Sequence, residues 1–169
     1  MPLFLKYNPE LVEAMLRPIV KYAKSKEWQY NFVPHDVGRY PIANGQWYGK
    51  NDDSEKQLSS QMPIEETGNM LLCLAAVKKY LESTPRLFEE NAELMKAWAD
   101  YLVKYGYEPG MQLCTDDFAG QSSHNCNLSL KAILGIASYS YLSDDGAYMQ
   151  KAKEYAEKWE KEAKAPHGA

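Results

Sequence analysis

The chain has 169 residues, of which 25% are charged and 45% apolar, and its formal net charge is −4. That length suits one domain with a sizeable core. Because the charge is slightly acidic and the sequence contains no basic block, we expect no nucleic-acid partner. The longest apolar run, residues 70–77, is far shorter than the roughly 20 residues that a membrane-spanning helix needs, so we expect no membrane partner.

The N-terminus and the cysteines bear on export, on disulfide bonds and on zinc binding. Residues 1–16 lack the basic region, the apolar stretch and the small-residue cleavage site of a signal peptide, and the compartment stays open at this point. Cys73, Cys114 and Cys126 have no C-x-x-C spacing and are odd in number, so we expect free thiols rather than a disulfide framework or a zinc site. Phosphate-loop, dinucleotide-binding and H-E-x-x-H motifs are missing, and we expect no cofactor and no metal.

Apolar periodicity predicts helices in five places along the chain. The expected ranges are 9–25, 65–81, 85–105, 125–141 and 146–164. The first of them has an N-cap signal, an asparagine at position 8 followed by a proline. Between the first two helices lies an irregular stretch whose aromatic first half we expect to be packed and whose polar second half we expect to be a surface loop.

The helices alternate in character. Those over 65–81 and 125–141 are apolar nearly all round, which predicts that they are covered on several sides, whereas the other three have a single apolar face. No strand pattern is visible. The alternation predicts an all-α fold of stacked helical hairpins, with inner helices in one layer and outer helices in another.

Three segments do not have the composition of packed helix: VPHDVGRYPIANG (33–45), MPIEETGN (62–69) and CTDDFAGQSSHNCN (114–127). Each combines carboxylates, small residues and amides. The last two come just before, or on the first turn of, an inner helix. Since stacked hairpins place such ends at one end of the molecule, we expect the three segments to share one polar cleft.

The chemistry expected of such a cleft is acid–base, because two carboxylates in different environments can serve as general acid and general base. Imidazoles titrate near neutral pH, and amides bind polar substrates by hydrogen bonds. The candidate catalytic residues are Asp36, Glu65, Glu66, Asp116 and Asp117. The candidate substrate-binding residues are His35, Asn44, Asn69, His124, Asn125 and Asn127.

Each candidate also has a structural interpretation. The glutamates at 65–66 lie where a helix N-terminus favours carboxylates, which by itself explains at least one of them and would lower its pKa. Carboxylates gathered in one cleft should instead raise one another's pKa values unless Arg39, Lys131 or backbone N–H groups compensate. The acidic pair at 116–117 suits a turn cap, and the His-Asp pair at 35–36 suits a turn. His124 is equally able to bond the loop backbone.

A family resemblance adds to these observations. The segments PHDVGRYPIANGQ, PIEETGNMLL and QLCTDDFAGQSSHNCNLSLKAI, together with YNPELVEAMLRPI and WADYLVKYGYEPG, resemble the central domain of the glutaminase A family over residues 3–142. That family resembles the six-hairpin glycosidases, whose fold is an α/α toroid. The resemblance implies hydrolysis of L-glutamine to L-glutamate and ammonia by secreted or cell-envelope proteins, and therefore an extracytoplasmic location.

The chain supplies fewer helices than the twelve of a complete toroid. We therefore expect residues 1–169 to form a single domain that is a partial α/α toroid, an excised part of a larger domain. Such a part would turn over its small-molecule substrate poorly, and its exposed apolar flanks would favour self-association. Two alternatives stay open: a glycoside-active or glycan-binding toroid domain, and a helical scaffold without chemistry.

Overall fold

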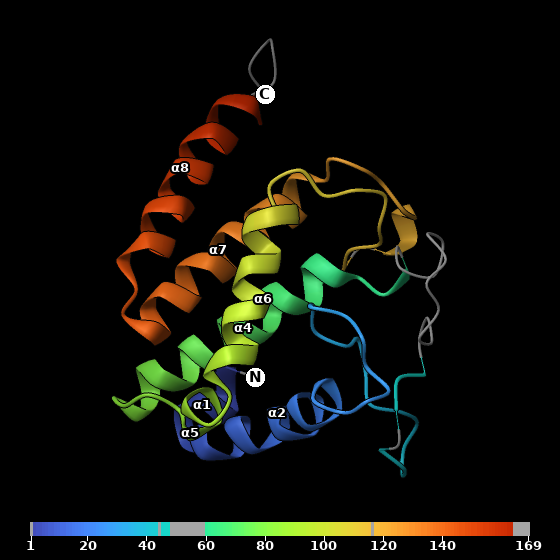
Figure 1. Cartoon of the computed structure of the whole chain (residues 1–169), viewed down its shortest axis with the longest axis vertical. Coiled ribbons are helices and arrows are strands. Elements are labelled where there is room, and N and C mark those ends of the chain that lie inside the picture. Colours follow the sequence, from blue (N-terminus) through green and yellow to red (C-terminus); the bar gives the residue numbers. More distant parts are fainter. Residues whose placement is uncertain (1, 44, 48–59, 116, 164–169) are drawn as a thin grey trace.

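The computed structural model describes residues 2–43, 45–47, 60–115 and 117–163 (Figure 1). Within these ranges the fold is all-helical, as predicted, and the one β feature is an isolated bridge between Gln112 and Ser122. No helix in the described part of the chain is long and apolar enough to cross a membrane. The helices are α1 (Pro2–Tyr7), α2 (Pro9–Ala23), α4 (Pro63–Leu81), α5 (Arg86–Glu89), α6 (Ala92–Tyr105), α7 (Cys126–Ser143) and α8 (Gly146–Glu162), with a 3₁₀ turn η1 (Asp117–Ala119).

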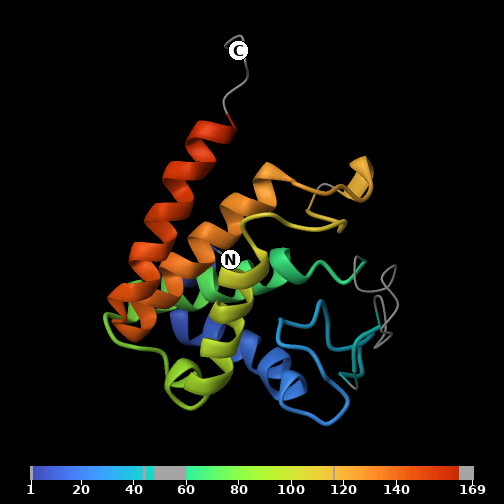
Figure 2. The ribbon, with the colours of Figure 1, turned by 45° about the horizontal axis from the view of Figure 1, so that its top comes forward.

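Helices α4 and α7 form the centre of the molecule and make its most extensive helix–helix contact. The two helices run in the same direction. Glu65 near the start of α4 pairs with Lys131 in the first half of α7, and Lys78 near the end of α4 donates to the Tyr141 carbonyl near the end of α7. The other helices surround this pair: α2 and α6 pack on α4, and α6 and α8 pack on α7, with α8 antiparallel to it (Figures 1 and 2). The predicted burial of the two inner helices is confirmed, because α4 and α7 are buried on several sides whereas α8 buries one residue, Ala152.

Two details of the helix prediction are wrong. The helix expected over 85–105 is broken at residues 90–91 into α5 and α6. Asn91 is held there by tertiary contacts: its side-chain Nδ2 donates to the Leu87 carbonyl at 2.8 Å, and its Oδ1 accepts from Lys24 Nζ at 2.8 Å. Helix α1 was not predicted, because six residues show too little periodicity; it is held by Leu5, which is buried in a small cluster between α2 and α4.

The aromatic half of the irregular stretch is packed, as predicted. Trp28 and Phe32 are buried, their rings lie 5.4 Å apart in an edge-to-face arrangement, and Trp28 Nε1 donates to the Phe32 carbonyl at 2.9 Å. Val33 follows with its backbone N–H donated to Thr67 Oγ1 of α4 at 3.0 Å. This bond fixes the segment to the first turns of α4. Most of the polar half, residues 48–59, lies outside the described residues.

The inner pair packs closely because glycines face each other. A Cβ placed on Gly135 of α7 would lie 3.1 Å from the Gly68 Cα of α4. A Cβ placed on Gly68 would lie 2.6 Å from Lys131 Cγ and 3.0 Å from the Lys131 carbonyl oxygen. Neither position has room for a side chain without a shift of the two helices.

We predict that Gly68→Ala lowers the free energy of unfolding by about 1–3 kcal/mol, because the added methyl group overpacks the contact between α4 and α7. Urea titration followed by circular dichroism measures the change. Gly146→Ala is the matched control, since a Cβ at Gly146 meets nothing within 4 Å. Equal stability of the two variants would contradict the prediction.

The self-association expected from the sequence has a candidate surface on α1 and α2. Phe4, Tyr7, Leu11 and Met15 follow one another along these helices, and each exposes at least 41% of its surface. We propose that a second copy of the chain covers this apolar stripe, because exposed apolar patches of this kind favour association.

Leu11→Lys is therefore expected to shift the protein toward monomer in light scattering at high micromolar concentration. Ile42→Lys is the control, because Ile42 is also exposed but lies in a loop outside the stripe. A wild-type protein that is strictly monomeric at that concentration would overturn the proposal.

Candidate acid–base site

Residues from all three polar segments meet at the first turn of α4. His35 Nε2, from the first segment, lies 4.0 Å from Glu66 Oε1. Thr115, from the third segment, donates its hydroxyl to Glu65 Oε1 at 2.5 Å. The convergence arises because the two loops pack against the start of the same buried helix. His35, Asp36, Glu65 and Glu66 together are called the acid–base site below.

Glu65 is held as a buried carboxylate. Its side chain is 2% exposed, and Oε1 receives the Thr115 hydroxyl, Lys131 Nζ at 3.0 Å and Asn69 Nδ2 at 3.4 Å. Burial by itself raises the pKa of this carboxyl, but the hydrogen bonds and the Lys131 charge together bring it below its usual value. The other oxygen, Oε2, is buried without a hydrogen-bond partner in the described part of the chain.

Glu66 has the opposite shift. Burial raises its pKa to about 7; the His35 charge opposes the increase and the neighbouring Glu65 carboxylate adds to it. The sequence left both directions open, because a helix N-terminus lowers a carboxyl pKa and gathered carboxylates raise one another's pKa unless a cation such as Lys131 compensates. The pKa of Glu65 is lowered, through its bonds to Thr115 and Lys131, and the pKa of Glu66 is raised, mainly by burial.

The imidazole of His35 lies between two carboxylates. Its Nδ1 is 3.2 Å from Asp36 Oδ2 and its Nε2 faces Glu66. Asp36 is itself fixed, since Oδ1 accepts the backbone N–H groups of Gly38 and Trp47, each at 2.8 Å. An ionised Asp36 can only accept, which places a proton on Nδ1 and directs Nε2 toward Glu66. These bonds agree with the turn interpretation of the pair, and its role in a functional site stays a prediction.

This arrangement provides the groups for general acid–base chemistry. One carboxylate is held ionised by an ammonium and a hydroxyl, and the adjacent one titrates near neutral pH beside an imidazole. In enzymes, a general acid and a general base are typically two neighbouring titratable groups whose environments give them different pKa values. Among the described residues, no group of three or more His, Cys, Asp or Glu side chains is placed to hold a metal ion.

Three of the predicted site residues cannot be placed. Asn44 and Asp116 lie outside the described residues, and the side chain of Asp117 in η1 is also outside them. Their predicted roles stay predictions. The neighbouring Thr115 is the residue that brings the third segment to the site.

The remaining candidates are at the start of α7. Asn125 is the N-cap of α7, and its Oδ1 accepts from the backbone N–H groups of Asn127 at 2.9 Å and Leu128 at 3.2 Å. The backbone N–H of His124 donates to the Pro109 carbonyl at 2.9 Å, and its side chain lines a cavity of about 210 Å³ beside α8. No contact joins Asn125, Asn127 or His124 to the acid–base site in the described part of the chain, and their binding roles stay predictions.

Sequence reasoning named Lys131 only as a cation that could compensate the carboxylates, and Thr115 only as part of a turn cap, so neither was a candidate site residue. Lys131 bonds both Glu65 and, at 2.8 Å, Asn69 Oδ1, and Thr115 bonds Glu65. The signal for Lys131 was its place one helical turn after Asn127, at the start of an inner helix. Only the contact between α4 and α7 shows which carboxylate it joins.

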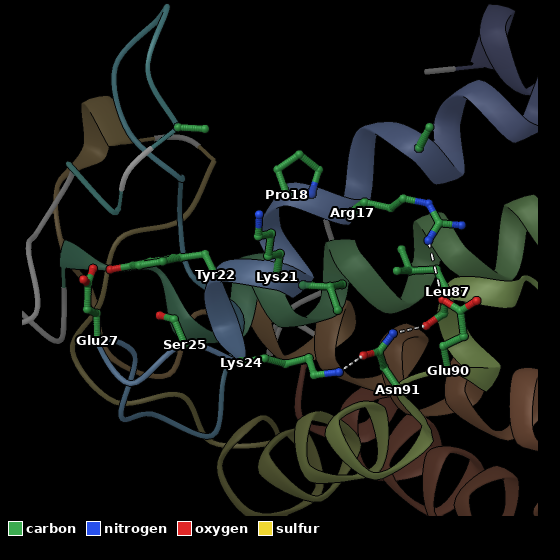
Figure 3. A pocket seen from close by; sticks show the side chains of 13 residues that line it. Arg17, Pro18, Lys21, Tyr22, Lys24, Ser25, Glu27, Leu87, Glu90 and Asn91 are labelled. Atoms are coloured by element: carbon green, nitrogen blue, oxygen red, sulfur yellow. Dashed lines mark hydrogen bonds and ion pairs between the residues drawn. The ribbon is translucent and has the colours of Figure 1, made fainter.

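A cavity of about 780 Å³ lies away from the acid–base site, between α2 and the α5–α6 junction (Figure 3). Two polar contacts cross it: Arg17 to Glu90 at 3.5 Å and Lys24 to Asn91 at 2.8 Å. Of the predicted site residues that the structure describes, none lines it. The polar cleft expected from the sequence is therefore not this cavity.

Comparison with known proteins gives the chain its relatives. Glutaminase A of Aspergillus oryzae is 33% identical over 167 residues, an alignment that covers 94% of this chain and 23% of the relative. A probable glutaminase of Arthroderma benhamiae is 27% identical over 222 aligned residues, covering 94% of this chain and 25% of the relative. The chain spans about a quarter of the length of these curated relatives.

No solved structure matches the chain significantly. The glutaminase A six helical-hairpin domain family matches all of residues 1–169. The helical architecture described above, with α4 and α7 as inner helices, agrees with that description. The chain therefore belongs to the glutaminase A six helical-hairpin domain family.

Proposed function

We propose that the chain contributes an acid–base site to a glutaminase A-like hydrolase, which converts L-glutamine and water to L-glutamate and ammonia. The observation that supports the chemistry is the pair of adjacent carboxylates with opposite pKa shifts beside an imidazole. The substrate follows from the names of the relatives, glutaminase A and a probable glutaminase. Because those relatives are about four times longer, the full reaction belongs to a longer protein that contains this chain.

Hydrolysis of a carboxamide requires a base and then an acid. In our proposal the Glu66 carboxylate takes a proton from the water that attacks the amide carbon, and a carbon–oxygen bond forms. The protonated Glu66 then gives that proton to the amide nitrogen, the carbon–nitrogen bond breaks and ammonia leaves. A pKa of about 7 suits both steps, since the two forms of Glu66 are similarly populated at neutral pH.

The neighbouring residues act as positioning residues. Asp36 holds the His35 ring through Nδ1, and His35 in turn faces Glu66. Lys131 keeps Glu65 ionised, and the charge of Glu65 adds to the raised pKa of Glu66. Following the family resemblance, we propose an extracytoplasmic location for the whole protein.

The activity test uses a protein of the relatives' length that contains this chain. We expect Glu66→Gln to lower kcat for ammonia release from L-glutamine by about 10²–10⁴-fold, because an amide cannot exchange the proton. Glu89→Gln, at an exposed position on α5, is the control and should keep the wild-type kcat. An unchanged kcat in Glu66→Gln would refute the assignment. The 169-residue chain alone is expected to release ammonia poorly.

The pH dependence of stability tests the Glu66 environment without any turnover. The folded-state pKa is raised from 4.5 to about 7, so the folded chain binds this proton more tightly than the unfolded chain does. The stabilisation from Glu66 is complete below pH 4.5 and is lost as the pH rises through about 7.

Glu66→Gln removes this loss. Relative to wild type, the variant should gain roughly 1–3 kcal/mol of unfolding free energy between pH 5 and pH 8, measured by urea titration at both values. Glu89→Gln should show no such gain. Parallel pH dependences of wild type and Glu66→Gln would mean that Glu66 is not buried as described.

A further inference from the structure

A further cavity, of about 520 Å³, lies between the 29–32 segment, the start of α4, the end of α6 and residues 108–112. Four of its lining residues are aromatic: Tyr30, Phe32, Tyr101 and Tyr105. Among the residues that the structure describes, no lysine, arginine or histidine is part of this lining. It is called the aromatic groove below.

The rings form a continuous row. Tyr30 and Phe32 stack with their ring centroids 5.0 Å apart and an interplanar angle of 21°. Phe32 meets Tyr101 at 5.3 Å, and Tyr101 meets Tyr105 at 4.9 Å, both tilted. Within the row Phe32 is buried, whereas Tyr105 is 46% exposed. The contacts fix the positions of the rings before any ligand binds, which lowers the entropic cost of binding.

Neutral hydrogen-bonding groups lie among the rings. Gln29 and Asn31 are exposed and make no hydrogen bond to any other residue that the structure describes. The hydroxyl groups of Tyr101 and Tyr105 likewise have no hydrogen-bond partner in the described ranges. Each amide offers a donor and an acceptor, and each phenol offers both. The carboxylate in the lining, Glu108, lies 3.8 Å from Lys158.

We propose that the aromatic groove binds a neutral saccharide. A pyranose ring has a flat face of C–H groups, which suits the electron-rich face of a tyrosine ring, and a rim of hydroxyl groups, which suits free amides and phenols. The Glu108 carboxylate in the lining disfavours an anionic ligand, and the nearby Lys104 ammonium is already placed over the Tyr105 ring.

Three groove residues lie close in sequence to residues that belong to the acid–base site or bond to it. Phe32 lies three residues before His35, and Pro63 lies two residues before Glu65. Gln112, also in the lining, accepts the Ile64 N–H at 3.1 Å and lies three residues before Thr115. Three residues span at most about 11 Å, so a saccharide in the groove lies next to the acid–base site.

The test is a binding experiment on the chain itself, and it is independent of the proposed glutaminase activity. Neutral hexasaccharides of β-1,4-linked glucose, α-1,4-linked glucose and β-1,4-linked N-acetylglucosamine are titrated up to about 10 mM, where even a weak site fills. Amide chemical shifts and calorimetry report binding. We expect at least one of the three to saturate and to shift the amide signals of residues 29–32 and 101–112.

Tyr105→Ala removes one ring and should weaken the saturating hexasaccharide by about tenfold. Tyr80→Ala is the matched control, because Tyr80 is 49% exposed and lies at the end of α4 outside the groove. Asn31→Ala tests the amide and should also weaken binding. Circular dichroism verifies that each variant is folded.

Three outcomes would overturn the proposal. The first is that none of the three hexasaccharides saturates the groove. Another is equal affinity of Tyr105→Ala and wild type. The third is saturation of the groove by an uncharged peptide, such as N-acetylated glycyl-glutamine amide, with no saccharide bound, which would assign the groove to a polypeptide.

Discussion

The close contact between α4 and α7 is the constraint on which the rest of the molecule depends. Glycines at 68 and 135 let the two backbones approach until no Cβ fits between them. This approach brings the Lys131 ammonium of α7 within 3.0 Å of Glu65 on α4. An unpaired carboxylate as deeply buried as Glu65 would cost several kcal/mol, and here the Lys131 charge from α7 and the hydrogen bonds from Thr115 and Asn69 offset that cost.

The same contact helps to give the two glutamates opposite pKa shifts. Lys131 forms its short ion pair with Glu65, which faces α7. Glu66 is left with burial and a nearby negative charge, both of which raise its pKa. Burial, together with the charge of the neighbouring Glu65 carboxylate, thus raises the pKa of Glu66 to about 7. The acid–base site is in this sense a consequence of how the core packs.

The aromatic segment connects this core to the surface. Residues 28–33 have no regular secondary structure, yet they are held by ring contacts and by the bond from the Val33 N–H to Thr67. Because this segment is fixed to α4, it orients His35 toward Glu66 on one side and lines the aromatic groove on the other. Loops that carry function are usually positioned by a rigid scaffold, and here the scaffold is the buried start of α4.

The sequence by itself determined where the main helices lie and which of them are inner or outer, because the periodicity of apolar residues shows whether a helix is buried on several sides or on one. It also pointed to the three polar segments, since carboxylates and amides before a buried helix have no packing role. It could not determine the break at Asn91, which depends on contacts with Lys24 and Leu87, or the short helix held by Leu5. Nor could it give the opposite pKa shifts of two adjacent glutamates, because a shift depends on which side chain receives the ammonium and which is left to burial. Only the packing of α7 on α4 decides that.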